Sequence, residues 1–347
     1  RAIKYAADNG AVVLQCSWGY ISGAANPYDW TPQFSTDDEW TAYNVLEKKA
    51  LDYFVHNAGS PDGVIEGGVV VFAGGNESAP AASYPAAYPE FVSVAATAAD
   101  YTPAVYTNYG PGVTISAPGG DQDYYFEYGE GPNTGAIGCV LSTLPYNVSG
   151  SAGPLAGYGY MEGTSMACPH VSAVVALGLS YATKLRKHFK AEEIRKMLCD
   201  SQNVTPIDEY MKGYKRYSRY VADIGAIQPM ELALAPYKGQ MGTGQVNAAK
   251  FLAAIGGEEA GAPMHFPNLV IKAEDTIAVN PSLYFVGGEN LTYIVTIEDT
   301  HIATHKAEGA NLVFSGLRVG STKATIKASN GETQNFTITV RKSSGWL

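Results

Sequence analysis

The sequence predicts an α/β fold with a doubly wound, mostly parallel sheet, followed by a smaller all-β domain. Short apolar runs alternate with helical stretches through the larger part of the chain, which is typical of parallel sheets covered by helices. Toward the C-terminus the apolar residues instead recur at every second position, as in half-buried strands. At 347 residues the chain is also too long for one ordinary core.

The α/β part begins with a helix followed by a strand. Residues 1–9 are predicted to be helical, with Gly10 as the C-terminal cap. A second helix is expected over residues 41–56, after a polar insertion at residues 20–40. Each short apolar run between helices predicts a buried strand. Three such strands are expected, at residues 11–17, 68–73 and 91–96.

A linker precedes the C-terminal part. Residues 256–263 are rich in Gly, Glu and Ala and end in proline, a composition typical of linkers. Beyond it, Asn330-Gly331 is a strong hairpin signal between two alternating strands. The alternating apolar residues are Ala324, Ile326, Ala328, Phe336, Ile338 and Val340. We therefore predict a small β-sandwich and place the two domains at residues 1–258 and 264–347.

Composition disfavours several classes of partner and site. With 23 basic and 33 acidic residues, the net charge of −10 argues against nucleic acid or an anionic membrane as the main partner. No apolar run approaches the roughly 20 residues that span a bilayer. The four cysteines form no C-x-x-C pair, so a zinc site is not expected. Cys16 and Cys168 are expected to be buried free thiols, whereas a Cys139–Cys199 disulfide is left open.

The octet Gly163-Thr164-Ser165-Met166-Ala167-Cys168-Pro169-His170 has the features of a catalytic helix start. Thr164 can cap a helix that continues through the apolar run 171–179, and Pro169 falls at the end of the first turn. Ser165 is then at a helix N-terminus, where backbone N–H groups and the helix dipole favour negative charge. Attack of a hydroxyl on a carbonyl develops an oxyanion at such a place. The alternative is a capped core helix that merely contains a serine.

The octet closely resembles the nucleophile motif of subtilisin-like serine proteases, the subtilase family. Five further segments resemble this family in the same order along the chain. They are Ser17-Trp18-Gly19, Ala73-Gly74-Gly75-Asn76, residues 84–96, Tyr106-Thr107-Asn108-Tyr109-Gly110 with residues 115–119, and Gly242-Thr243-Gly244-Gln245-Val246-Asn247-Ala248-Ala249. The resemblance implies a serine endopeptidase on a subtilisin-like fold that lacks its N-terminal part, with a polypeptide as substrate.

The resemblance also implies roles for individual residues. Ser165 would be the nucleophile, and the Asn76 side chain with the Ser165 backbone N–H would hold the oxyanion. The segment 17–19 would pair with the substrate backbone as an added strand. The implied substrate-binding residues are Ser17, Trp18, Gly19, Ala73, Gly74 and Gly75. For Asn76 the alternative is a turn or helix-capping asparagine.

A serine nucleophile needs a base and an orienting carboxylate, which in this family come in the order aspartate, histidine, serine. Neither motif is present, and the chain opens at Arg1 in a helical pattern. We therefore expect the later part of a longer protein, inactive without the segment that carries Asp and His. His170 lies about 140° around the helix from Ser165 and is expected to be a core residue bonded to backbone. A catalytic role is also not expected for the other histidines, which are His56, His188, His265, His301 and His305.

Further expectations follow from the resemblance. Calcium is common in this family, but no carboxylate cluster here is diagnostic of it, and no cofactor is expected to be required. The segment Leu317-Arg318-Val319-Gly320-Ser321, followed by the two alternating strands, resembles bacterial immunoglobulin-like domains of surface proteins. A secreted or cell-surface location is therefore expected. The rival interpretation is a non-catalytic surface binding or adhesion protein on a degenerate protease fold, which intact Ser165 and Asn76 argue against.

Three stretches depart from a minimal subtilase. Residues 20–40 and 121–155 are expected to be surface loops near the active-site face. In residues 201–239 aromatic and basic residues interleave, which can indicate nucleic-acid binding. The net charge instead favours a surface insertion anchored by its tyrosines. The interleaved residues are Tyr210, Lys212, Tyr214, Lys215, Arg216, Tyr217, Arg219 and Tyr220.

Overall fold

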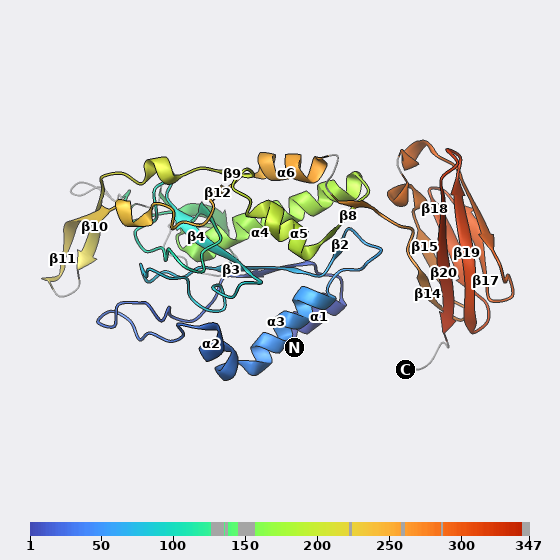
Figure 1. Cartoon of the computed structure of the whole chain (residues 1–347), viewed down its shortest axis with the longest axis horizontal. Helices are drawn as coiled ribbons and strands as arrows, with labels where there is room; N and C mark the ends of the chain where they lie inside the picture. The colour runs from blue at the N-terminus through green and yellow to red at the C-terminus, as the bar shows by residue number, and fades with distance from the viewer. Residues whose placement is uncertain are drawn as a thin grey trace. The chain divides into compact units, whose positions relative to one another are not determined.

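The computed structural model describes residues 1–125, 135, 138–144, 157–221, 224–257, 261–285 and 287–341, without the side chains of residues 262 and 263 (Figure 1). The chain forms two compact units. The first comprises Arg1–Ala58, Gly67–Gly178 and Ala191–Ala254, and the second comprises Gly59–Glu66, Leu179–Lys190 and Ile255–Leu347. This division differs from the limits 1–258 and 264–347, which stay a prediction.

The first unit is built on a six-stranded sheet with the strand order β1-β3-β4-β5-β12-β9. The strands are β1 (Val13–Cys16), β3 (Val69–Ala73), β4 (Val92–Thr97), β5 (Ile115–Pro118), β12 (Gln245–Val246) and β9 (Val204–Thr205). All neighbours pair in parallel except β12 and β9. β3 and β4 are buried along their whole length, as their apolar sequences predict. The expected mostly parallel α/β fold is confirmed.

Helices cover both faces of this sheet. Helices α1 (Ala2–Asp8), α2 (Asp37–Tyr43) and α3 (Val45–Asn57) lie on one side, and α4 (Thr164–Lys184) and α5 (Ala191–Leu198) lie on the other (Figure 1). A last helix, α6, spans Ala248–Gly256. Leu51 and Phe54 of α3 share a core with Val70 and Phe72 of β3, so the helix is held by its apolar face.

The single helix expected over residues 41–56 is wrong. Two helices meet at Asn44, and the first begins earlier because Thr36 caps it by accepting a hydrogen bond from the Glu39 N–H at 3.2 Å. The helix therefore takes up the end of the insertion 20–40. Trp40, expected in a surface loop, is 0% exposed and packs against Tyr84.

The cysteines are free thiols. Cys16 and Cys168 are buried, as predicted. Cys139 and Cys199 are also free, so the disulfide that was left open is not formed. Among the described residues, α4 is the one helix that is long and apolar enough to span a bilayer. α4 reaches this limit by its average hydropathy, whereas His170, Ser172 and Ser180 interrupt its apolar residues, so it contains no unbroken apolar run of about 20 residues. A soluble core helix passes the same test, and α4 buries Ala167, Val171 and Val175.

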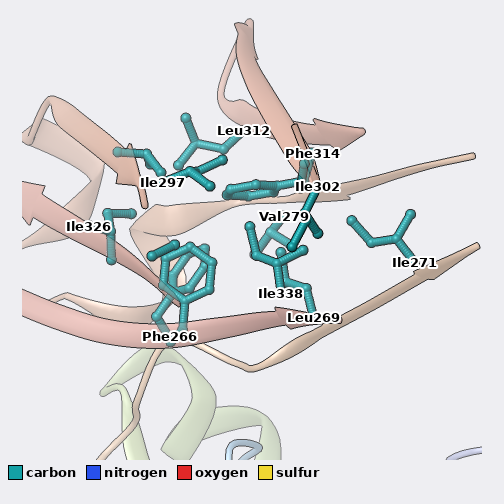
Figure 2. Close-up of a cluster of buried hydrophobic side chains, with 14 of the residues drawn as sticks. Phe266, Leu269, Ile271, Val279, Ile297, Ile302, Leu312, Phe314, Ile326 and Ile338 are labelled. Atoms are coloured by element: carbon teal, nitrogen blue, oxygen red, sulfur yellow. The ribbon is translucent and has the colours of Figure 1, made fainter. Parts of the chain in front are cut away.

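The second unit is rich in β-structure. One sheet has the order β14-β20-β19-β16 and another the order β15-β18-β17. The strands are β14 (Leu269–Lys272), β15 (Thr276–Val279), β16 (Tyr293–Ile297), β17 (Ala303–Glu308), β18 (Asn311–Gly316), β19 (Gly320–Ala328) and β20 (Thr333–Arg341). Side chains from both sheets form one core, among them Ile271, Phe314, Ile326 and Ile338 (Figure 2). A small separate sheet joins β13 (Ala262–Pro263), β8 (Lys187–Lys190) and β2 (Ile65–Glu66).

The predicted hairpin around Asn330-Gly331 is confirmed. β19 and β20 pair antiparallel with Ala324 opposite Phe336, and the predicted alternating residues are buried. The Gly331 N–H donates to the Ala328 carbonyl at 3.0 Å, and Gly331 has φ +94°, which favours glycine.

The insertion 201–239 contains an antiparallel hairpin of β10 (Tyr214–Val221) and β11 (Ala226–Ala233). Tyr214 and Tyr220 are 70% and 63% exposed, so these tyrosines do not anchor it, although Tyr210 stacks on Tyr101. Lys215 is the buried residue of β10. Tyr237, at the end of the insertion, is also buried and its ring centroid lies 4.2 Å from that of Tyr109, so a lysine and a tyrosine both hold the insertion. Of the insertion 121–155, residues 126–134, 136–137 and 145–155 lie outside the described residues. Its described part includes β6 (Val140–Thr143), which pairs with β7 (Tyr158–Met161).

Candidate active site

Ser165 is the second residue of α4 and is half-buried. The preceding turn is fixed by Gly163, whose φ of +138° favours glycine. The Gly163 N–H donates both to the Gly119 carbonyl at 3.0 Å and to the Tyr106 hydroxyl at 2.8 Å. The same hydroxyl donates to the Gly120 carbonyl at 2.7 Å. The start of α4 is therefore tied to the loop that follows β5.

The segment after β1 is bound to Ser165. In a regular helix the Ser165 carbonyl would accept from the N–H four residues later, but Pro169 has none. The Ser17 hydroxyl takes its place and donates to the Ser165 carbonyl at 2.7 Å. In return, the Ser165 Oγ lies 3.4 Å from the Ser17 carbonyl. Pro169 thus frees an acceptor that joins α4 to the end of β1.

Asn76 lies beside Ser165 with its amide held in one orientation. Its Oδ1 accepts from the Thr164 N–H at 2.9 Å and from the Thr164 hydroxyl at 2.8 Å, and that hydroxyl accepts from the Gly75 N–H at 3.2 Å. Because a backbone N–H can only donate, Oδ1 must face Thr164. Within the described residues neither Asn76 Nδ2 nor the Ser165 N–H has a protein partner. The Asn76 Nδ2 group and the Ser165 N–H are therefore both available as hydrogen-bond donors near the Ser165 hydroxyl.

These contacts correct one local expectation. The Thr164 hydroxyl does not cap its own helix but binds Asn76 and Gly75. Asn76 itself caps α4 from a distant segment, so the capping role considered as its alternative is present alongside the free Nδ2 donor.

A pocket of about 110 Å³ opens at this place. Of the predicted residues it is lined by Trp18, Gly19, Ala73, Gly75, Asn76 and Ser165. Gly74 is buried and donates its N–H to the Val94 carbonyl at 2.9 Å, and Ser17 contacts Ser165 as described. Sequence reasoning missed Glu77 and Ser83, which also line the pocket. Only their proximity to the predicted motifs could have pointed to them.

The histidines of the first unit have partners other than Ser165. His170 Nδ1 lies 2.8 Å from the Met166 carbonyl, so the expected backbone bond is confirmed, although the ring is half-buried rather than in the core. His56 is exposed and lies 3.6 Å from Glu90. His188, His265, His301 and His305 belong to the second unit. In the described part of the chain no cluster of three His, Cys, Asp or Glu residues could hold a metal ion.

Buried charges lie near the site. Lys215 Nζ is 2.5 Å from Asp121 Oδ2, and both side chains are at most 1% exposed. Burial lowers the pKa of Lys215 and raises that of Asp121, while the attraction between the two charges opposes both shifts. Glu162, three residues before Ser165, accepts a hydrogen bond from the Gln122 N–H, and burial raises its pKa. The hairpin β10–β11 and the loop 121–125 are thus joined to the segment that carries Ser165.

Comparison with known proteins places this geometry in a family. The family model described as "Subtilase family" matches residues 1–219. Over 134 residues the chain is 34% identical to an extracellular basic protease of Dichelobacter nodosus, covering 38% of this chain and 19% of that protein. Over 208 residues it is 30% identical to fervidolysin of Fervidobacterium pennivorans, covering 56% of this chain and 23% of that protein. A solved protease structure from Pseudoalteromonas arctica shares 30% identity with a TM-score of 0.36, covering 54% of this chain and 43% of that one.

The matched segments thus span less than a quarter of the two relatives. The family model, in contrast, covers more than half of this chain and includes Ser17, Asn76 and Ser165. This chain belongs to the subtilase family of serine proteases.

Proposed function

We propose that this chain carries the nucleophile and the oxyanion hole of a subtilisin-like serine endopeptidase. The observation that supports this most strongly is the orientation of Asn76. Thr164 binds its Oδ1, so the Nδ2 donor is left free beside the Ser165 hydroxyl at the start of α4. Asn76 is exposed, so this donor is accessible to a bound substrate.

In the proposed reaction Ser165 Oγ attacks the carbonyl carbon of the scissile peptide, and the hydroxyl proton passes to a base. The carbonyl oxygen becomes an oxyanion that accepts hydrogen bonds from Asn76 Nδ2 and the Ser165 N–H. The dipole of α4 adds positive potential at the same point. Collapse of the intermediate expels the amine and leaves an acyl-enzyme on Ser165, which water then hydrolyses. Ser17, Trp18 and Gly19 would hold the substrate backbone, and Ala73, Gly74 and Gly75 one wall of its side-chain pocket.

The base and its orienting carboxylate are proposed to lie in a segment other than these 347 residues. The two histidines of the first unit are bound to Met166 and Glu90, and the aspartate and histidine motifs of the family are not in the sequence. We therefore propose that this chain alone is inactive. The proposed second domain at residues 264–347 is immunoglobulin-like, and extracellular relatives support secretion of the protein.

A fluorophosphonate probe tests these assignments, because it reacts with activated serines. The longer protein should be labelled at Ser165, whereas its S165A variant and the isolated 347-residue chain should not. N76A should lower turnover by about 10²–10³-fold, a value measured for the corresponding asparagine of a subtilisin and taken over from it. Strong labelling of the isolated chain would refute its inactivity. An upstream reading frame without Asp and His motifs would favour a non-catalytic binding protein.

A further inference from the structure

We propose that Asn108 is a positioning residue for the oxyanion hole, which fixes the segment from Gly74 to Ala79 and thereby sets the direction of the Asn76 amide. The proposal rests on the proposed function of Asn76. It is carried by the hydrogen bonds of one fully buried side chain, which all go to this one segment.

The acceptor side of Asn108 binds two backbone donors. Asn108 is 0% exposed, and its Oδ1 accepts from the Glu77 N–H at 3.0 Å and from the Ala79 N–H at 2.9 Å. Its own backbone N–H donates to the Gly75 carbonyl at 3.1 Å. Because both backbone N–H groups can only donate, the oxygen of the Asn108 amide must face them.

The donor side of the same amide binds two further acceptors. Asn108 Nδ2 donates to the Gly74 carbonyl at 3.2 Å and to Glu77 Oε2 at 2.5 Å. An asparagine side chain offers two donors and two acceptor positions, and here all four are used. All four hydrogen bonds of the Asn108 side chain are made to residues 74–79, so this amide is dedicated to holding that segment.

The segment needs such a partner because its backbone is irregular. It leaves β3 through Gly75 with φ +110° and contains Ser78 with φ +53°. No strand pairs with residues 74–79. Some of their backbone groups bond to the backbone of neighbouring loops, such as the Ser78 N–H to the Tyr106 carbonyl at 2.8 Å, whereas the Glu77 and Ala79 N–H groups donate to the Asn108 side chain. A Cβ placed on Gly75 would lie 2.2 Å from Asn108 Nδ2, which shows how closely the two fit.

Asn76 is therefore held from two directions. Thr164 binds its amide oxygen, and Asn108 fixes the backbone on both sides of it. Without Asn108 the backbone can move while Thr164 keeps hold of the side chain, so Nδ2 shifts away from the oxyanion. A misplacement of about 1 Å costs on the order of 10²-fold in rate.

The test measures kcat and KM of the longer protein on a peptide amide. N108A should lower kcat by about 10–10²-fold and leave KM within about two-fold, because the oxyanion forms only after substrate binding. In an N76A background the same substitution should lower kcat by less than about two-fold, since the donor it positions is gone. A purely structural role would give the same loss in both backgrounds. N247A is the matched control, because Asn247 also uses both ends of its amide but lies outside the site.

N108D keeps the volume of the side chain and guards against misfolding. It retains the acceptor for the Glu77 and Ala79 N–H groups but places a carboxylate against Glu77 Oε2. N108D should lose activity, and N108D/E77Q should regain a part of it, because glutamine supplies the missing donor. E77Q alone gives the reference for this comparison.

Backbone hydrogen exchange in residues 74–79 measures how firmly Asn108 holds this segment, and it does not depend on catalysis. N108A should accelerate it about ten-fold or more, as expected when backbone donors lose their partner. If S165A keeps wild-type activity, the proposed function fails, and this exchange still decides whether Asn108 holds the segment. Unchanged exchange, an unchanged kcat in N108A, or an equal loss of kcat with and without Asn76 would each overturn the proposal.

Discussion

Replacing Lys215 with methionine should destabilise the first unit by about 3 kcal/mol, at the lower end of the range for breaking a buried ion pair. Lys215 Nζ contacts Asp121 Oδ2 at 2.5 Å and the Pro103 carbonyl at 2.7 Å. Methionine fills similar space without the charge. It leaves Asp121, 0% exposed, without the lysine charge, and the remaining donors among the described residues are the N–H groups of Val105 and Tyr124, at 3.0 and 3.2 Å. These two bonds are the reason for choosing the lower end.

The loss of stability in K215M should depend on pH. Burial raises the pKa of Asp121, and the Lys215 charge opposes that rise. Without the lysine the pKa rises further, so the folded variant binds a proton that the unfolded chain releases. Stability of the variant then increases as pH falls through the raised pKa. We expect a larger loss relative to wild type at about pH 8 than at about pH 5. D121N/K215M removes both charges and should cost less than K215M alone.

Unfolding in urea followed by tryptophan fluorescence measures these differences. Trp18, Trp30 and Trp40 are three of the four tryptophans, and all lie in the first unit, so the signal reports its unfolding. A loss of less than about 1 kcal/mol in K215M, the size found for a surface ion pair, would refute the role given to Lys215. A pH-independent loss, or a double variant as unstable as K215M, would refute it too.

Three further predictions concern other contacts. S17A should cost about 1–2 kcal/mol in urea unfolding, because Pro169 cannot supply the donor that the Ser165 carbonyl loses. S17A/P169A should recover part of this loss, and no recovery would contradict the role given to Pro169. The cysteines should resist iodoacetamide at about pH 8 until the chain unfolds, because burial raises the pKa of each thiol, to about 12 for Cys16. Rapid labelling of the folded chain, found by mass spectrometry, would contradict it. G331A should destabilise the second unit by about 1–2 kcal/mol through its positive φ, seen as faster hydrogen exchange in β19 and β20. Unchanged exchange there would count against it.

The parts of the fold predicted from sequence are those with a local signal. The strands β3 and β4 are short apolar runs, and the hairpin β19–β20 has alternating burial around an Asn-Gly turn. Each pattern depends on residues within about ten positions, and burial acts on them directly. The early start of α2 is not predicted by the apolar pattern, because that start is set by the polar cap Thr36.

The site could be predicted only where its residues stand inside motifs. Ser165 and Asn76 lie 89 positions apart, and their separate motifs, rather than their contact, pointed to both. Gly75 and Asn108 also lay within recognised segments, yet nothing local assigns Asn108 its partners 29 to 34 positions away.

Lys215 is the clearest example of a contact that the local sequence does not predict. In sequence it stands among tyrosines and arginines, a pattern typical of an exposed basic surface, and its neighbours Tyr214 and Arg216 are indeed exposed. Its burial depends on Asp121, 94 positions earlier, because this carboxylate and the Pro103 carbonyl replace the water that a buried ammonium group loses. The alternation of β10 then decides which residue of the hairpin faces inward. A charged residue at an inward position of a strand therefore indicates an oppositely charged partner from another part of the chain. For the hairpin this contact leads through Asp121 and the Gln122 N–H to Glu162, beside the proposed nucleophile.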